Sequence, residues 1–372
     1  MTVRLRGLQI RHLGKALHYV FHNEDDGEGE VTSFGALCTA LSATIGTGNI
    51  VGCATAIVAG GPGALFWMWL AAFFGMATKY AEGMLAVKYR VIAEDGHALG
   101  GPFYYIEKGM GKNFKWLAKL FCVFGTMVGL FGIGTFTQVN GITSAVNNFF
   151  DPSNVHTISL FGMNYSISVV VAGIIVTICA GLVIIGGIKR ISKVSEVIVP
   201  FMAVTYIGVC LIIVFTHLPQ VPAAFAEIVQ SAFGLKAVAG GAIGAMTVAM
   251  QKGIARGIFS NEAGLGSAPI AAAAAQTNEP VRQGLVSMTG TFIDTIIVCT
   301  MTGLAIVMTG AWDMGLEGVA VTTKAFALGL PFPAKASAFV LMMCLVFFAF
   351  TYNSWNGIIT VKGLSGISDK RT

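Results

Sequence analysis

The segment Ala43-Thr44-Ile45-Gly46-Thr47-Gly48-Asn49-Ile50 interrupts a long apolar run with two glycines and an asparagine. Glycine costs about 1 kcal/mol relative to alanine in a helix interior, and the Asn49 side chain needs a polar partner in hydrocarbon. An unwound stretch facing a cavity meets both needs, because its carbonyls can coordinate a cation and its amides can bind a carboxylate. Close packing through small residues is the structural alternative, but it explains neither Asn49 nor Thr47. The sequence therefore predicts a membrane helix that is broken at this segment.

A second broken segment is predicted between Gln251 and Ser267, which contains four glycines and charges of both signs. Ionisable groups in a membrane span point to function by default, although Lys252, Arg256 and Glu262 can equally mark the exit of the helix from the membrane. We expect Ser260 and Asn261 to line a site. The two breaks lie five spans apart and face opposite ways, as two halves related by inverted topology require.

The composition indicates a membrane protein, because 55% of the residues are hydrophobic and only 11% are charged, against about a quarter charged in soluble domains. Backbone amides must be satisfied within a bilayer, so the long apolar segments are predicted to be helices. The fold class is thus an all-α polytopic membrane protein with a single transmembrane domain over residues 1–372. The predicted spans are 34–60, 63–88, 117–147, 166–188, 196–217, 237–262, 284–310 and 335–355.

Orientation follows from the basic residues in the connections between spans. If the N-terminal stretch that includes Arg4 and Arg11 is cytoplasmic, most of the 23 Lys and Arg residues fall on the cytoplasmic side. Only Lys236, Lys324 and Lys335 then lie outside. We expect a multi-pass protein of the cytoplasmic membrane with a cytoplasmic N-terminus, and a lipid bilayer rather than nucleic acid as the partner of the +5 net charge.

Other polar residues in the spans are weaker candidates. Gln138 can either bind a zwitterionic ligand or hold two helices together. Asp294 is a mid-membrane carboxylate that serves either as an ion or proton site or as the partner of a buried donor, and the second interpretation is slightly favoured. Lys79 and Glu82 lie too near a helix end to be told apart from side chains that reach for the interface.

No catalytic constellation is recognisable, because GxSxG, HExxH and P-loop motifs are all missing from the sequence. The seven cysteines form no CxxC pair, so neither a disulfide framework nor a zinc site is indicated. We expect no enzymatic activity and no cofactor. Transport driven by a nucleotide is unsupported, so an ion gradient is the natural energy source for transport.

The run Gly60-Gly61-Pro62-Gly63-Ala64-Leu65-Phe66-Trp67-Met68-Trp69-Leu70-Ala71-Ala72-Phe73-Phe74-Gly75 closely resembles the signature of the sodium:alanine (alanine or glycine:cation) symporter family. The segments GTGNI (46–50), GPFYYIEKGMG (101–111), GIARGIFSNEAGLGSAPIAAAAA (253–275) and TGTFIDTIIVCT (289–300) are similar to the same family. The resemblance covers roughly residues 3–351. It implies a secondary transporter of the LeuT-type inverted-repeat fold, with broken first and sixth core helices, that imports alanine or glycine with sodium.

Position by position, the resemblance implies two sites. A substrate site is expected at Gly46, Thr47, Gly48, Asn49, Gln138, Ser260 and Asn261. Sodium, the coupling ion, is expected near the carbonyls of residues 44–47, including Thr44 and Gly46, and near the hydroxyl of Thr351.

The chain departs from the family pattern at both ends. Family members carry an apolar span before the segment that resembles residues 2–17, and further spans after Thr351, so the second repeat is expected to be incomplete. The tail 357–363 can be written in codons whose second frame reads Asn-Tyr-Tyr-Gly-Glu-Arg, a family-like stretch, which suggests a frame shift after Thr351. Two alternatives to a working symporter therefore stay open: a truncated family member without transport activity, and a channel, for which filter loops and charge rings are missing.

Overall fold

The computed structural model describes residues 1–22, 27–94, 96–131, 133–160, 162–235 and 241–367, with the backbone alone at 133 and at 353–367. The elements of the first half are α1 (Leu8–Arg11), α2 (Leu13–Phe21), α3 (Ser33–Thr44), η1 (Gly48–Gly52), α4 (Cys53–Gly60), α5 (Gly63–Lys88), β1 (Val91–Ile92), β2 (Ala98–Leu99), α6 (Pro102–Met110), η2 (Lys112–Phe114), α7 (Lys115–Leu130), α8 (Ile133–Phe150), β3 (Thr157–Leu160), β4 (Met163–Ser166), α9 (Ile167–Ile184) and α10 (Gly187–Thr216). Those of the second half are η3 (Leu218–Gln220), α11 (Val221–Ala232), α12 (Ala242–Asn261), α13 (Ala268–Ala272), α14 (Pro280–Thr291), η4 (Phe292–Cys299), α15 (Thr300–Met308), η5 (Ala311–Asp313), α16 (Val319–Gly329) and α17 (Ala334–Ile367).

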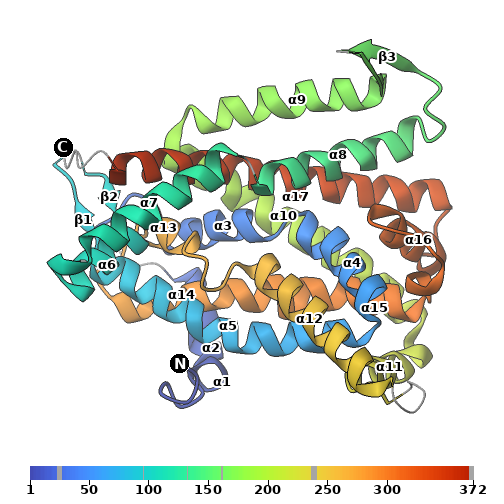
Figure 1. Ribbon diagram of the computed structural model, residues 1–372, viewed down its shortest axis with the longest axis horizontal. Helices are drawn as coiled ribbons and strands as arrows, with labels where there is room; N and C mark the ends of the chain where they lie inside the picture. Colours follow the sequence, from blue (N-terminus) through green and yellow to red (C-terminus); the bar gives the residue numbers. More distant parts are fainter. Residues whose placement is uncertain (23–26, 95, 132, 161, 236–240, 368–372) are drawn as a thin grey trace.

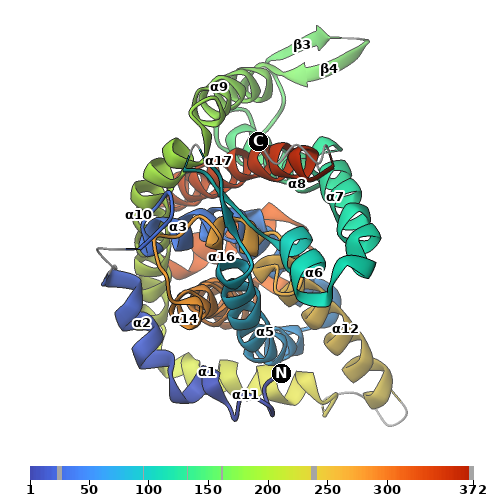
Figure 2. The same ribbon diagram turned by 90° about the vertical axis from the view of Figure 1, so that its left-hand side faces the viewer.

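The long helices run along one common direction and form a bundle (Figure 1). The β1–β2 hairpin and α6 lie at one end of the bundle, and α11 and α16 lie at the other. Helix α5 packs against α12 and α14, α10 against α3, and α17 against α7 and α8. Seen along the bundle, α9 and the β3–β4 hairpin stand out from one side (Figure 2).

Two small hairpins qualify the predicted all-α class. Strands β1 and β2 pair antiparallel, as do β3 and β4, and both hairpins lie in connections between long helices. The second hairpin is held by Asp151, whose carboxylate accepts hydrogen bonds from the Val155 and His156 amides and the Ser166 hydroxyl. These bonds, the Val155 amide foremost, lower the pKa of the Asp151 carboxyl. The hairpins add no layer to the helical bundle.

Five helical segments are long and apolar enough to cross a membrane, and a bent pair brings the number to six within the described residues. They are Lys112–Phe150, Ile167–Ile184, Gly187–Thr216, Pro280–Met308, Ala334–Tyr352 and the pair Ser33–Thr44 with Gly48–Gly60. Helices α5 and α12, which coincide with the expected spans 63–88 and 237–262, are not among them. Both carry charged residues, including Lys79 and Glu82 in α5 and Lys252 and Arg256 in α12, which lower their hydropathy.

The chain bends at the glycine-containing segment with which the sequence analysis began. Helix α3 begins at Ser33 after a Thr32 cap, whose hydroxyl accepts a hydrogen bond from the Gly35 amide at 2.9 Å. It ends at Thr44, and Ile45 has extended dihedral angles. The helix that follows, Gly48–Gly60, is inclined by 51° to α3. Residues 45–47 therefore leave backbone groups outside the regular helical pattern in the middle of the bundle.

The second break is shorter than the sequence predicts. Helix α12 continues through Gly253 and Gly257 to Asn261, and the chain leaves the helix only at Glu262, which has a left-handed backbone with φ of 53°. The chain is then irregular up to Ser267, before α13. The prediction that the break begins near residue 251 is wrong because the two glycines serve packing: an added Cβ at Gly253 would lie 2.2 Å from Ala64 O.

This contact leads to a stability prediction with a control in the same helix. We expect Gly253→Ala to lower the free energy of unfolding by about 1–3 kcal/mol, because the new methyl group would push α12 away from the α5 backbone. Gly244→Ala, at a glycine with no atom within 4 Å of an added Cβ, should leave stability unchanged or slightly raised. Thermal unfolding of both purified variants in detergent checks this. Equal stability of the two variants would contradict the packing role of Gly253.

Candidate functional site

Asp294 lies at the centre of a buried polar cluster between the two breaks. It belongs to η4, a π-helical stretch within the long helical segment Pro280–Met308, and it is 0% exposed. π-Helical turns are rare and often occur at functional sites. Both oxygens of the Asp294 carboxylate accept hydrogen bonds, Oδ1 from Asn49 and Oδ2 from Ser260 and Thr295. A carboxylate with three donors is thus held inside the bundle, joined to both broken helices.

Asn49 connects the first break to Asp294. Its Nδ2 donates to Asp294 Oδ1 at 2.7 Å and to Asp294 O at 3.1 Å. Its Oδ1 accepts a hydrogen bond from the Gly46 amide at 2.9 Å, so the side chain also bonds the backbone of the bend three residues earlier. Asn49 is therefore buried with both ends of its amide satisfied, and it fixes the bend relative to Asp294.

Ser260 and Asn261 connect the second break to the same carboxylate. Ser260 Oγ donates to Asp294 Oδ2 at 2.9 Å. Asn261 Nδ2 donates to Thr295 Oγ1 at 3.1 Å, and Thr295 Oγ1 in turn donates to Asp294 Oδ2 at 2.7 Å. Asn261 also accepts the Ala263 amide, at the point where the chain turns out of α12. The last turn of α12 thus lies directly against Asp294.

Gln138 reaches the first break from α8. Its Oε1 accepts the Thr47 amide at 2.8 Å, and it is 3% exposed. An added Cβ at Gly46 would lie 2.6 Å from Gln138 Nε2, so only glycine leaves room for this side chain. The nearest atoms to an added Cβ at Gly48 belong to Ser260, with Cα at 3.9 Å. The expected substrate-site residues therefore lie in one contiguous region.

The two threonines expected at the sodium site are satisfied within their own helices. Thr44 Oγ1 donates to Leu41 O at 3.3 Å, and Thr351 Oγ1 donates to Phe348 O at 3.0 Å. Both are buried, at 7% and 2% exposed, and helix α17 packs against α3. The Thr351 hydroxyl donates to carbonyls of its own helix and to the Met202 sulfur, and not to residues 44–47.

The cluster around Asp294 has the chemistry of a site for a hard cation. Besides its carboxylate, it contains the hydroxyl oxygens of Ser260 and Thr295, whereas Asn49 presents its Nδ2 to the carboxylate and its amide oxygen to the Gly46 amide. Oxygen ligands of this kind suit non-transition cations that prefer carboxylates, carbonyls and hydroxyls. Among the described residues, no three His, Cys, Asp or Glu side chains are grouped for a tighter metal site.

A second group of buried charges lies next to the second break, on α5. Glu82 Oε1 accepts the Gly266 amide at 3.2 Å, so the carboxylate supports the irregular segment after α12. Lys79, one turn earlier, is 3% exposed and forms no hydrogen bond or ion pair with any described residue. Its ammonium acts on Glu82 and on Glu262 through space. The sequence could not tell Lys79 and Glu82 apart from side chains that reach for the interface, and in the structure both are buried.

Sequence reasoning slightly favoured a structural role for Asp294 as the partner of a buried donor. It left open whether this carboxylate binds an ion or only satisfies a buried donor, and the geometry shows that residues of both breaks converge on it. Thr295 was not singled out at all. The available signal was the Asp-Thr pair in an otherwise apolar span, since an ionisable residue in such a span is a functional candidate by default.

Comparisons with known proteins identify the family. The family model described as "Sodium:alanine symporter family" matches residues 1–370. The chain belongs to this family. Its fold resembles that of the solved structure titled "Crystal structure of MhsT in complex with L-phenylalanine", with a TM-score of 0.60 at 14% identity over 92% of this chain and 77% of that one. The protein, here called the symporter-family chain, is thus a helical membrane transporter.

Individual relatives support the same assignment. The symporter-family chain is 57% identical over 353 residues to an uncharacterized transporter of Haemophilus influenzae, covering 94% of this chain and 73% of that protein. It is 45% identical over 359 residues to the sodium/alanine symporter AgcS of Methanococcus maripaludis, covering 94% and 74%. A probable sodium/glutamine symporter of Bacillus subtilis, GlnT, is 40% identical over 349 residues, covering 93% and 68%. Two of these relatives are thus named for the symport of an amino acid with sodium.

Proposed function

We propose that the symporter-family chain imports alanine, glycine or a similarly small neutral amino acid together with sodium. The observation that carries this proposal is the convergence of both breaks on one buried carboxylate, with Asn49 and Ser260 on its two oxygens. A buried ionisable group in a transporter fold is expected to bind the coupling ion or the substrate. The family assignment and the relative named as a sodium/alanine symporter support the same conclusion.

In this proposal, sodium is coordinated by oxygens around Asp294, and the carbonyls of residues 44–47 with the Thr351 hydroxyl form a further candidate cation site. Sodium bound at Asp294 neutralises the carboxylate that now accepts hydrogen bonds from three donors. Because the Asn49 amide oxygen also holds the Gly46 amide, cation binding there changes the geometry of the first break. The coupling of ion and substrate follows from this shared residue.

The amino acid is proposed to bind beside the first break, at Gly46, Thr47, Gly48 and Asn49, with Gln138, Ser260 and Asn261 around it. Its carboxylate is favoured at the start of the helix Gly48–Gly60, where the helix dipole attracts an anion. The substrate is small because side chains already crowd this region: an added Cβ at Gly141 would lie 2.4 Å from Thr47 Cγ2.

For the topology, we propose two inverted repeats in the cytoplasmic membrane, with the chain's N-terminus in the cytoplasm. The β1–β2 hairpin and α6 lie at one end of the bundle, and the N-terminus lies in the half nearer that end (Figure 1). Basic residues gather in this region, among them Lys88, Arg90, Lys108, Lys112 and Lys115. Positive charge is enriched in cytoplasmic connections, which supports this orientation.

The proposal is tested by uptake of radiolabelled alanine into proteoliposomes, with and without an inward sodium gradient. We expect accumulation above the equilibrium level only with the sodium gradient, and inhibition by unlabelled glycine. Accumulation that is unaffected by the ion gradient would contradict sodium coupling. No accumulation from folded, reconstituted protein would contradict transport.

A pair of variants in α8 makes this test specific to the site. Gln138→Ala should raise the KM for alanine about tenfold, because it removes the acceptor that positions the Thr47 amide, a loss of about 1–2 kcal/mol. Asn140→Ala is the matched control, since the side chain of this exposed asparagine accepts a hydrogen bond from Ser144 of the same helix. A change of similar size in both variants would remove Gln138 from the proposed site.

A further inference from the structure

The strap, defined as residues 27–31, precedes α3 and pairs with the chain segment that follows α13. Glu30 N and Val31 N donate to Ala274 O at 2.8 and 3.1 Å, and Gln276 N donates to Val31 O at 2.7 Å. Thr277 N donates to Glu28 O at 3.2 Å. These bonds join two segments that are about 245 residues apart in sequence by backbone alone.

Two glycines allow this close approach. An added Cβ at Gly29, which has φ of 146°, would lie 2.4 Å from Ala275 O. An added Cβ at Gly27 would lie 2.6 Å from Gln276 C. Any side chain at these positions would push the strap off the segment 273–277, so the contact depends on glycine.

The Arg90 side chain donates hydrogen bonds both to the strap and to the segment 273–277. Its Nη1 donates to Ala273 O at 2.9 Å and Ala275 O at 2.6 Å, and its Nη2 donates to Thr277 O at 2.8 Å and Glu28 O at 2.5 Å. All four acceptors are backbone carbonyls. A guanidinium with donors in a fixed fork can fill such a cage, and a lysine cannot replace its geometry.

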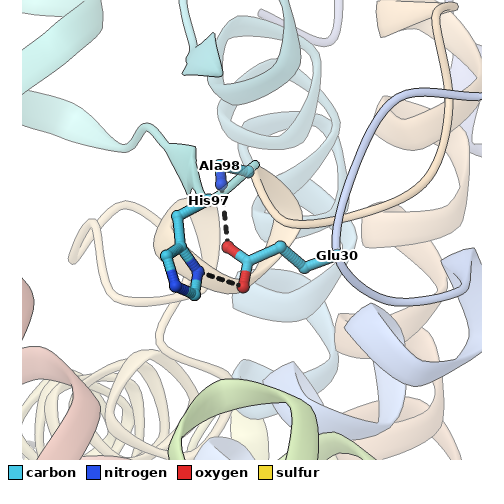
Figure 3. A network of polar contacts seen from close by, with 3 residues as sticks. All are labelled: Glu30, His97 and Ala98. Carbon is cyan, nitrogen blue, oxygen red and sulfur yellow. Dashed lines mark hydrogen bonds and ion pairs between the residues drawn. The ribbon is translucent and has the colours of Figure 1, made fainter. Parts of the chain in front are cut away.

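The β1–β2 hairpin also binds the strap, through the Glu30 side chain. Glu30 Oε2 lies 2.8 Å from His97 Nδ1, and Glu30 Oε1 accepts the Ala98 amide at 2.8 Å (Figure 3). The Glu30 side chain is 1% exposed, whereas that of His97 is 52% exposed. Both oxygens of the buried Glu30 carboxylate are thus bound by the hairpin that directly follows Arg90.

These contacts join the two parts of the chain that lead to the candidate site. The strap runs directly into α3, which ends at the first break, and the segment 273–277 lies between the second break and α14, which leads to Asp294. The strap, the segment 273–277 and Arg90 thus meet beside the β1–β2 hairpin, which lies at one end of the bundle (Figure 1).

We propose that the strap, the segment 273–277 and Arg90 form a latch that keeps this end of the transporter closed, and that the latch opens as one unit when the substrate leaves toward the cytoplasm. The gating role rests on the proposed function, whereas the existence of the latch does not. Opening separates α3 from the segment after α13, so the Arg90 bonds and the Glu30 bonds must break together with the backbone pairs.

Hydrogen–deuterium exchange of the protein in lipid nanodiscs tests the latch without any need for transport. In the unmodified chain, we expect slow exchange of the Glu30, Val31, Gln276 and Thr277 amides. Arg90→Ala and, independently, Gly29→Ala should accelerate exchange on both sides of the latch at least tenfold. Lys112→Ala, at an exposed basic residue on the same end, should not. Acceleration on one side only, or none, would overturn the latch as a unit.

Efflux of labelled alanine from loaded proteoliposomes tests the gating role. Arg90→Ala should raise the efflux rate several-fold, and Arg90→Lys should do so as well, because the ammonium cannot reach four carbonyls at once. Both variants are compared with Lys112→Ala at equal amounts of folded protein. Faster amide exchange without a change in efflux would overturn the gating role alone. Failure of the proposed function would show differently, as an unmodified chain without sodium-dependent uptake.

Discussion

Asp294→Asn is expected to abolish sodium-dependent alanine uptake, with a loss on the order of 100-fold or more. The substitution keeps the size of the side chain but removes the charge on which Asn49, Ser260 and Thr295 converge. Hydrogen bonds to a charged group contribute about 1.5–3 kcal/mol each, so weakening two of them already corresponds to a factor of about 100 or more. A neutral amide also cannot balance the charge of a sodium ion.

The measurement is initial-rate uptake at several sodium concentrations, with sodium-induced thermal stabilisation of the purified protein as a second readout. Asp313→Asn, at an exposed aspartate in η5, is the control and should change neither. The thermal readout separates lost ion binding from lost folding, because a folded variant still melts cooperatively but no longer responds to sodium. Normal sodium dependence in Asp294→Asn would rule out this carboxylate as an ion ligand.

The site was partly predictable because its residues violate the rules of an ordinary span. Glycines and Asn49 inside an apolar run required an explanation from local chemistry alone, and the structure bends the chain at this segment by 51°. The approach of Gln138 to Thr47, across 91 residues, depends on how α8 packs. No local pattern contains that information, so the residue was visible from sequence as a candidate but its partner was not.

The errors have a similar physical origin. Gly253 and Gly257 carry the same local signal as Gly46, but they lie in a continuous helix because their missing side chains let α12 approach the α5 backbone. Their distance to a helix end could not separate Lys79 and Glu82 from interfacial side chains, whereas in the structure the segment after α12 covers Glu82. Whether a glycine breaks a helix or packs it is decided by the neighbouring helix, which the sequence does not name.

The latch illustrates a further limit of sequence reasoning. Most of its contacts use backbone carbonyls and amides, which every residue carries, so the sequence contains almost no sign of the pairing between 27–31 and 273–277. Arg90 was counted only as one of the basic residues that orient the chain. Its four carbonyl partners show that a topology signal and a structural clamp can be the same residue.

Asn49→Ala carries the second large expected effect, since it removes the side chain that links the first break to the carboxylate. The variant leaves the Gly46 amide without its acceptor and Asp294 Oδ1 without its 2.7 Å donor. An unsatisfied buried polar group costs about 1–3 kcal/mol, and we expect a loss of stability of this order. Uptake should fall further than stability, by about 10-fold to 100-fold, because the bend that holds the substrate and the residue that contacts the cation site are lost together.

Thr55→Ala is the control for Asn49→Ala, because Thr55 lies in the helix after the bend and its hydroxyl bonds only Val51 O of the same helix. Uptake rates, the sodium concentration at half-maximal uptake and thermal unfolding are compared for the two variants. If Asn49 joins the ion and substrate sites, its loss should shift the sodium dependence as well as the KM for alanine. A higher KM for alanine with an unchanged sodium dependence would confine Asn49 to the substrate site, and the coupling would then have to run through Ser260 and α12 instead.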